Sequence, residues 1–246
     1  MLSFIVPAYN EELELPSTLS AIRAAADANS EPYEIIVVDD GSTDATATLA
    51  ATGGARIVTI HRRQIAAARN AGAREARGDI LFFVDADTRI SPAHVPGVQG
   101  ALAAGCAGGG ARVIIDGLVP LWGRIFARVF SVFYFNVANL GAGAFLFTTR
   151  KNFDRAGGFD EQLFAGEEIY FSQALKKLGR FRVLPDPVVT SGRKLRMHSA
   201  RKILGLSVGI VLRGKQGVRA SERLDLWYDG KRETKARNAV SGNAPG

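Results

Sequence analysis

The sequence contains almost no cysteine or histidine. Its 246 residues include one cysteine, Cys106, and three histidines. A single cysteine cannot form an internal disulfide, and no cluster of cysteine and histidine has the spacing of a zinc site. These absences exclude a disulfide-stabilised domain and a zinc module, and they favour a reducing compartment.

The sequence also lacks a secretory signal and a continuous apolar run long enough to span a bilayer. It begins with a strand-like run, Leu2–Val6, and has no basic segment followed by a long apolar stretch, so we expect a cytoplasmic protein. No charged residue lies between Arg128 and Arg150, but asparagines and glycines interrupt this stretch. We therefore expect a helix, a glycine loop and a buried strand, Ala144–Thr148, in place of a spanning helix.

A net excess of positive charge is absent until the C-terminal part of the chain. The formal net charge is +7, yet residues 1–192 carry 18 basic and 20 acidic side chains, whereas residues 193–246 carry 13 basic and 4 acidic ones. Such a block can bind phosphates or an anionic membrane surface at the inner face of a membrane, or it can simply be solvated. We expect no nucleic-acid partner, because no recognition motif accompanies the basic excess.

Short runs rich in Val, Ile and Phe alternate with segments of helical spacing over about the first 100 residues. This alternation predicts an α/β fold with a mostly parallel central sheet and helices on both faces. The predicted strands are Leu2–Val6, Glu34–Asp39, Arg56–Thr59 and Ile80–Val84. The predicted helices are Glu12–Ala28, Asp44–Ala51, Gln64–Ala76 and a segment with Ser91 as N-cap and Pro92 at its first position, ending near Ala104.

After Gly105 the composition becomes rich in glycine and aromatic residues, and the regular alternation ends. We expect two halves of one domain, residues 1–105 and 106–215, and a C-terminal extension, 216–246, that is disordered from about Gly230. The further predicted elements are strands at Arg112–Ile115, Arg182–Leu184 and Val188–Thr190 and helices at Leu121–Val137, Glu168–Leu178 and Ala200–Leu212. The segments Trp122–Phe135 and Ala200–Leu212 combine apolar and basic residues, so they could pack on the domain or rest in a membrane interface.

Carboxylates follow the predicted strands, at the edge where an open parallel sheet binds ligands. Asp85 and Asp87 come directly after the buried run Ile80–Val84. Their spacing of two places both side chains on one side of an extended chain, where they can share one hard cation, Mn²⁺ or Mg²⁺, with a diphosphate. Surface loops also contain this triplet often, so its position after a strand is what favours a metal site.

Asp39, Asp40 and Arg69 each allow two interpretations. The Asp39-Asp40-Gly41-Ser42 sequence can form a turn whose Ser42, or the following Asp44, caps the next helix, and it can equally contact a ligand. Arg69 could bind a base or a phosphate, or it could lie on a solvated helical face.

Several ordered motifs together resemble the family 2 glycosyltransferases, which have the GT-A fold. They are IVPAYNEE at 5–12, VVDDGSTD at 37–44, RNAG at 69–72, GDILFFVDAD at 78–87, GGFDE at 157–161 and GEE at 166–168. Some are weak alone, but their order is kept from residue 5 to residue 168. The resemblance implies transfer of a sugar from a UDP- or GDP-linked donor to a hydroxyl acceptor, with inversion and with Mn²⁺ or Mg²⁺ as cofactor. A lipid-linked acceptor is one option.

The resemblance also implies roles for individual residues. The metal would be bound by Asp85 and Asp87. The donor-sugar and acceptor pocket would be formed around Gly143, Gly158, Phe159 and Asp160. The nucleotide would contact Pro7, Ala8, Tyr9, Glu11, Asp39, Asp40, Arg69 and Asp85.

The candidate general base departs from the family pattern. Family members more often read GED, whereas this chain has Gly166-Glu167-Glu168, so either glutamate could accept the acceptor's proton. These glutamates could instead only complement the dipole of a helix N-terminus.

A basic segment follows the last predicted strand. In similar folds this part closes over the diphosphate, which implies diphosphate contacts for Arg193, Lys194 and Arg196. His198 could complete the metal shell, although a histidine in a basic stretch is more often solvent-exposed.

Two other functions stay open. A nucleotidyltransferase would also use a carboxylate-bound metal, but it would normally have a glycine-rich loop with a lysine after the first strand, where this chain has Ala8-Tyr9-Asn10-Glu11. A catalytically silent nucleotide-sugar-binding protein would keep the metal pair without a working base. Retaining stereochemistry is also open.

Overall fold

The computed structural model describes residues 1–117, 122–123, 135 and 138–193. In this part the chain forms one eight-stranded sheet with the order β3-β2-β1-β4-β7-β6-β8-β5. The strands are β1 (Leu2–Ala8), β2 (Tyr33–Asp39), β3 (Arg56–Thr59), β4 (Ile80–Val84), β5 (Thr88–Arg89), β6 (Cys106–Asp116), β7 (Phe145–Thr149) and β8 (Arg180–Ser191).

The first four long strands form the parallel half of the sheet. β1 pairs in parallel with β2 on one side and with β4 on the other, and β2 pairs in parallel with β3. These strands read as near-continuous apolar runs because both faces of a parallel sheet are covered. All four lie where the sequence predicts them.

The second half of the sheet is mixed. β7 runs antiparallel to both β4 and β6, and the short β5 runs antiparallel to β8. β6 and β8 are parallel to each other. The predicted α/β fold is confirmed, with β5 and β7 reversed relative to the other strands.

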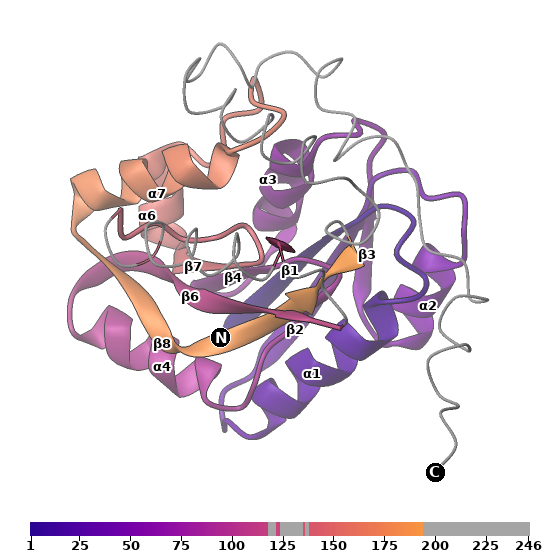
Figure 1. Ribbon diagram of the computed structural model, residues 1–246, viewed down its shortest axis with the longest axis horizontal. Coiled ribbons are helices and arrows are strands. Elements are labelled where there is room, and N and C mark those ends of the chain that lie inside the picture. The colour runs from indigo at the N-terminus through magenta and orange to yellow at the C-terminus, as the bar shows by residue number, and fades with distance from the viewer. Residues whose placement is uncertain (118–121, 124–134, 136–137, 194–246) are drawn as a thin grey trace.

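Helices cover both faces of the sheet (Figure 1). One face carries α1 (Leu15–Asp27), α2 (Thr46–Thr52) and α4 (His94–Ala103), and the other carries α3 (Ile65–Glu75), α6 (Arg150–Ala156) and α7 (Glu167–Leu178). Each face has its own apolar core. Phe4, Phe82 and Phe145 belong to the first core, and Phe83 and Phe171 to the second.

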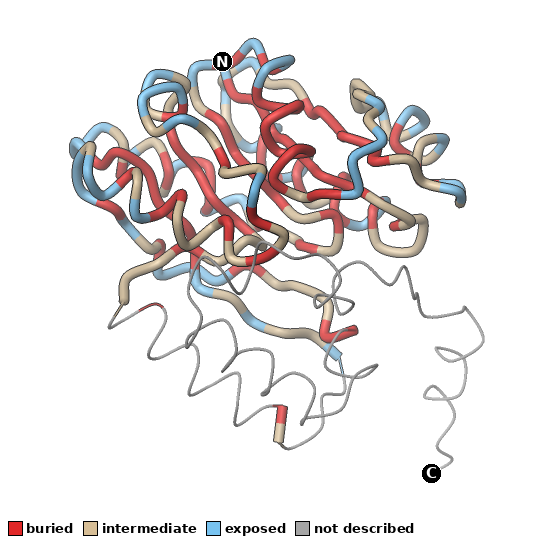
Figure 2. Tube along the Cα trace, turned by 90° about the horizontal axis from the view of Figure 1, so that it is seen from above, coloured by how far each residue is buried: buried red, intermediate tan, exposed pale blue. Residues whose placement is uncertain are grey.

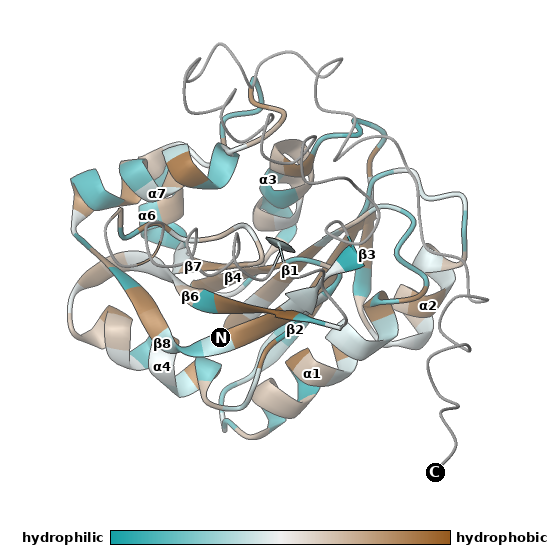
Figure 3. Cartoon of the chain, viewed as in Figure 1, coloured by the Kyte–Doolittle hydropathy of each residue, from teal (hydrophilic) through white to brown (hydrophobic). Residues whose placement is uncertain are grey.

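Burial and hydropathy follow this layering. The buried segments run along the strands in the middle of the molecule, and the exposed segments lie at its periphery (Figure 2). The central strands are hydrophobic, whereas α7 carries hydrophilic positions along its outer side (Figure 3). The polar residues discussed below therefore stand out against an apolar sheet.

The glycine run after residue 105 belongs to a strand, which the prediction missed. β6 begins at Cys106 and not near Arg112, and it includes Gly108–Gly110. A side chain at Gly109 would collide with the carbonyl oxygen of Arg182 and with the ring of Phe147. Glycine is required here by close packing, not by a loop.

The last strand is also longer than predicted. Two short strands were expected, but β8 is continuous from Arg180 to Ser191. It accommodates Asp186 and Pro187 through a shift of pairing register opposite the segment between Ala111 and Val113 on β6. A bulge of this kind permits a proline inside a strand.

Three smaller features differ from the prediction. α4 begins at His94, so Ser91 is not its N-cap, and the Ser91 carbonyl accepts from the His94 amide in the preceding turn. α6 and β5 were not predicted. α6 is a helix of 7 residues and β5 has 2, so neither carries a periodic signal.

The uncharged stretch before Arg150 contains the expected buried strand, because β7 covers Phe145–Thr149. Within the described residues no helix is both long and apolar enough to cross a membrane. Three predicted features cannot be compared with the structure. The helix at 200–212 and the tail from Gly230 fall outside the described residues, and the helix at 121–137 does so except for residues 122–123 and 135. The division at residue 105 stays a prediction.

Candidate active site

The carboxyl ends of β1, β2 and β4 lie side by side, because these strands are parallel neighbours. Ala8 at the end of β1 is in register with Asp39 at the end of β2, and the Asp40 amide donates to the Ala8 carbonyl at 2.9 Å. Pro7 and Ala8 are buried. These two residues can therefore meet a ligand mainly through their backbone.

The loops after β1 and β2 hold each other. Asn10 has a positive φ of 51°, its amide donates to Ser42 Oγ at 2.9 Å, and its side-chain oxygen accepts from the Thr43 amide at 2.8 Å. The Glu11 amide donates to Thr46 Oγ1 at 2.7 Å. Together these bonds fix the polar rim above β1 and β2.

Asp39 and Asp40 both accept backbone amides. Asp39 Oδ1 accepts from Ser42 at 3.1 Å, which closes the predicted turn. Asp40 accepts three amides in succession, from Arg62 and Arg63 at 2.6 and 2.8 Å and from Gln64 at 2.8 Å. Asp40 thereby fixes the loop that leads into α3.

Arg63 lies beside the predicted nucleotide contacts, although no motif in the sequence points to it. Its φ is 49°, and its guanidinium carbon lies 3.3 Å from the centroid of the Tyr9 ring. A non-glycine residue in this conformation is uncommon and is found more often at functional sites. The pair forms an aromatic and cationic edge to the candidate site.

Arg69 is the buried centre of the site. It lies on α3, and only 1% of its side chain is exposed, so the solvated helical face is excluded. Nη2 donates to Asp85 Oδ1 and to the Gly143 carbonyl, both at 2.9 Å, and Nη1 donates to Glu167 Oε1 at 2.5 Å. Burial alone would lower the pKa of Arg69, but Asp85 and the two glutamates of α7 outweigh it and raise that pKa.

Asp85 and Asp87 occupy the turn after β4, as the sequence predicts. Their side chains are 26% and 16% exposed. Asp87 Oδ1 accepts from Thr190 Oγ1 at 3.2 Å, and its other oxygen lies 3.8 Å from Arg193 Nη2. Among the described residues, no three histidine, cysteine, aspartate or glutamate side chains are grouped so that they could hold a metal ion by themselves.

Glu167 and Glu168 begin α7 after Gly166, which has a φ of 70°. Glu167 is buried and bound to Arg69, whereas Glu168 is half-buried. Burial, together with the neighbouring charge of Glu167, raises the pKa of Glu168 to about 8, although Arg69 acts in the opposite direction. These acidic residues do sit at a helix N-terminus, but the contact with Arg69 shows that dipole compensation is not their whole role.

Arg193 joins the end of the described chain to its beginning. Its two terminal nitrogens donate to the two carboxylate oxygens of Glu11 at 2.9 and 2.8 Å. Nearby, Ser191 Oγ donates to Glu14, whose pKa is raised by burial and by the charge of Asp87. Glu11 and Arg193, predicted to bind nucleotide and diphosphate, thus form a bidentate pair in this structure.

The residues predicted to shape the sugar pocket have mixed surroundings. Gly143 lies against Arg69, and Asp160 accepts from the Gln162 amide at 3.0 Å. Phe159 is only 2% exposed and packs against the core phenylalanines Phe83 and Phe171, so it belongs to the core and does not line a pocket. Gly158 has a φ of 70°, and a side chain there would come within 2.9 Å of Asn70 Oδ1.

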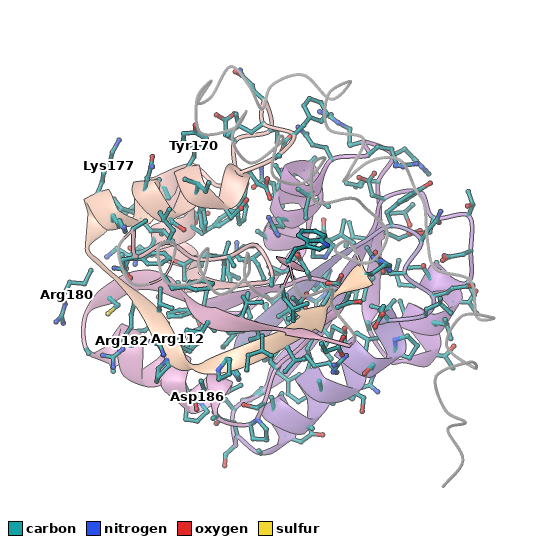
Figure 4. All side chains as sticks on the ribbon, in the orientation of Figure 1. Arg112, Tyr170, Lys177, Arg180, Arg182 and Asp186 are labelled. Carbon is teal, nitrogen blue, oxygen red and sulfur yellow. The ribbon has the colours of Figure 1, made fainter. Side chains whose placement is uncertain are left out.

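Part of the predicted site falls outside the described residues, namely Lys194, Arg196 and His198. Other basic side chains are described but lie apart from the cluster. Lys177 and Arg180 project outward where α7 passes into β8 (Figure 4). They are therefore not part of the candidate active site.

The model of the family described as glycosyl transferase family 2 matches residues 3–158, well over half of the chain. The chain belongs to glycosyl transferase family 2. This match includes the strand-end motifs and both carboxylates of the turn after β4.

Curated relatives match over a shorter region. An undecaprenyl-phosphate 4-deoxy-4-formamido-L-arabinose transferase of Aeromonas hydrophila subsp. hydrophila is 39% identical over 103 residues, which are 39% of this chain and 32% of that protein. The protein of the same name from Pseudomonas fluorescens is 40% identical over 101 residues, 38% of this chain and 30% of that protein. The matches thus span about a third of these relatives.

Solved structures share the fold over nearly the whole chain. The mannosyltransferase PcManGT from Pyrobaculum calidifontis, in complex with GDP-Man and Mn²⁺, has a TM-score of 0.65 at 18% identity and covers 99% of this chain and 76% of its own. TarS from S. aureus with UDP-GlcNAc has a TM-score of 0.62 at 15% identity, with coverages of 93% and 71%. At these identities the likeness establishes the fold alone.

Proposed function

We propose that this family 2 glycosyltransferase moves a sugar from a UDP- or GDP-linked donor to a hydroxyl acceptor, with inversion at the sugar carbon and with a divalent metal ion. The observation that carries this function is the cluster around Arg69. It joins the carboxylate after β4 to the glutamate that begins α7, so a donor-binding group and a candidate base share one edge of the sheet. Family membership supports the same reaction.

The residues of the turn after β4 fit a hard cation. Asp85 and Asp87 offer carboxylate oxygens that are partly exposed, which suits Mn²⁺ or Mg²⁺. Because the described residues supply no third histidine, cysteine or carboxylate, the diphosphate and His198 are the candidates to complete the coordination. When bound, the metal would neutralise the charge on the departing diphosphate.

Glu168 is the better candidate for the general base. Glu167 is committed to Arg69, whereas Glu168 lies one residue further along the first turn of α7 and has a pKa raised to about 8. A base is most effective when its pKa lies near the working pH. In the proposed step the acceptor oxygen bonds to the sugar carbon, its proton passes to Glu168, and the nucleoside diphosphate leaves with the electrons of the broken bond.

The nucleotide would lie along the ends of β1 and β2. Tyr9, Asp39 and Arg63 line that edge with aromatic, acidic and cationic groups. Asp40 is occupied by three backbone amides, so we expect it to support this edge and not to bind the ribose through a free carboxylate.

A lipid-linked acceptor at a membrane surface is the finer part of the proposal. Relatives named undecaprenyl-phosphate transferases support it, although they match only about two fifths of this chain. The basic excess of residues 193–246 suits an anionic surface. Salt-sensitive co-sedimentation with anionic vesicles, compared with neutral vesicles, tests this part. The expected cytoplasmic location stays a prediction.

Donor hydrolysis tests the main proposal without a known acceptor. UDP-, GDP- and dTDP-sugars would be incubated with wild type and Asp87→Ala, with and without Mn²⁺ or Mg²⁺. Asp154→Ala, an exposed position on α6, is the matched control. We expect one donor to be cleaved only with metal and only by wild type and the control. Nucleotide binding without turnover would favour the catalytically silent binding protein. The absence of both binding and turnover would refute the proposal.

A further inference from the structure

Arg69 is buried too deeply to serve as an ordinary nucleotide contact. It is among the largest fully buried side chains of the described residues, and both terminal nitrogens already donate to protein acceptors. Its remaining nitrogen, Nε, is also buried and has no hydrogen-bond partner in the described part of the chain. A buried guanidinium is tolerated because two carboxylates compensate it.

The chain is built closely around this side chain. A Cβ atom on Gly143 would lie 3.0 Å from Nη2, so glycine is needed for the loop to approach and for its carbonyl to accept. The guanidinium carbon also lies 5.2 Å from the centre of the Phe159 ring. Arg69 therefore has contacts from the turn after β4, from the loop before β7 and from α7 at once.

The next residue holds the same region from the other side. Asn70 Oδ1 accepts from the Phe159 amide at 2.9 Å, and its amide nitrogen donates to the Phe159 carbonyl at 2.8 Å. Gln64, at the start of the same helix, donates to the carbonyl of Leu163 at 3.3 Å. α3 thus fixes the loop that leads into α7, and Arg69 fixes the first residue of α7.

We propose, on the basis of the glycosyltransferase function above, that Arg69 is a positioning residue. It holds Asp85, on the donor side, and Glu167, next to the candidate base Glu168, in one fixed relation. Proximity of this kind matters because a displacement of about 1 Å can reduce a rate about 10²-fold. Lysine cannot replace it, since one ammonium group lacks the planar fork that reaches both carboxylates.

Three variants test this role. Arg69→Lys keeps the positive charge, and Arg69→Met removes it. The double variant Arg69→Met/Glu167→Gln removes the charges of Arg69 and of Glu167 together. Arg74→Met, at an exposed position on the same helix, is the matched control. Each would be measured for its unfolding midpoint, for calorimetric affinity for Mn²⁺ with UDP or GDP, and for kcat and KM of donor hydrolysis.

A positioning role predicts a loss in kcat with little change in nucleotide affinity. We expect Arg69→Lys to bind the nucleotide within about threefold of wild type and to lose about 10²-fold in kcat. The double variant should fold and still not recover kcat. Since Arg69 lowers the pKa of Glu168 against the effects of burial, Glu167 and Asp85, the rising limb of the pH profile should also move to higher pH in Arg69→Met.

Other outcomes overturn the inference in distinguishable ways. A nucleotide affinity reduced more than tenfold with kcat unchanged would make Arg69 a direct ligand contact. A lower unfolding midpoint with normal kcat and KM would make it only structural. If wild type itself turns over no donor, the proposed function fails and the positioning role fails with it. If Arg69→Met does not fold, Arg69→Lys decides.

Discussion

The carboxylates at the strand ends differ in what holds them. Those after β2 accept backbone amides: Asp39 from Ser42, and Asp40 from three successive residues before α3. Asp44 likewise accepts from the Thr46 amide at the start of α2. We call Asp39, Asp40 and Asp44 the amide-held carboxylates. A backbone amide cannot move away without unfolding its loop.

Three other carboxylates, after β1, after β4 and at the start of α7, are bound by guanidinium groups instead. Arg69 holds Asp85 and Glu167, and Arg193 holds Glu11. We call Asp85, Glu167 and Glu11 the arginine-held carboxylates. Arg69 keeps its two partners in place, whereas Arg193 also lies 3.8 Å from Asp87 and can compete there with an arriving metal ion. The comparison therefore separates the carboxylates that hold loops from those that lie beside the proposed reaction.

The largest expected effect concerns catalysis beside the arginine-held group. Glu168→Gln removes the proposed base and should lower kcat by about 10²–10⁴-fold, with little loss of stability. Wild-type kcat/KM should rise with pH up to about 8, because the base must lose its proton. Steady-state kinetics from pH 6 to 9 with transfer to an acceptor measure both, and Glu75→Gln on α3 is the control. Full activity of Glu168→Gln would assign the base elsewhere.

The amide-held group should show the opposite behaviour. Asp40→Ala leaves three backbone amides without their acceptor, which should cost about 3 kcal/mol of unfolding free energy or more. Urea denaturation measures the loss, and Asp154→Ala should stay within about 0.5 kcal/mol of wild type. A loss below about 1 kcal/mol would mean that water replaces the carboxylate, and the amide-held group would then not be the frame of the site.

The sequence predicts the fold where the signal is local. The apolar runs of β1, β2 and β4 and the carboxylates that follow them lie within a few residues of each other. β6 was missed in part because its glycines resemble a loop, and only close packing explains them, as at Gly109 against Phe147 and Arg182. β5 was missed because its two residues form a strand only by pairing with Thr190 and Val189.

The candidate site follows the same rule. Its acidic residues could be predicted from motifs, but their partners could not. Glu167 is 98 residues from Arg69, and Arg193 is 182 residues from Glu11. An arginine can be buried here only because the finished fold brings two carboxylates to it. The sequence alone therefore could not decide whether Arg69 contacts a ligand or lies on a solvated helical face.

A smaller effect tests whether Arg193 competes with a metal ion at Asp87. Arg193 Nη2 lies 3.8 Å from Asp87, where it competes with any other cation. Arg193→Met should therefore raise the affinity for Mn²⁺ by at least about fivefold, because a unit charge at about 4 Å contributes about 1 kcal/mol in bulk water and more at a largely buried pair such as this one. Titration of Mn²⁺ followed by electron paramagnetic resonance measures it. Arg56→Met, which disrupts a surface pair with Glu34, is the control. Weaker Mn²⁺ binding would make Arg193 a supporting residue of the site instead of a competitor.

A final expected effect is a pH dependence of stability that originates at Glu168. Its pKa is about 8 in the folded protein and near the ordinary 4.5 when unfolded, so between these values only the unfolded chain has released the proton. The contribution of Glu168 to the free energy of unfolding therefore falls as pH rises from about 4.5 to 8, and it is constant above that. Glu168→Gln, which is always neutral, should match wild type at pH 4.5 and become progressively more stable than it up to pH 8. Thermal unfolding at several pH values, with Glu75→Gln as background, measures the difference. A difference that does not grow with pH would show that the glutamate is solvated, and it would then lack the raised pKa that suits a base near neutral pH.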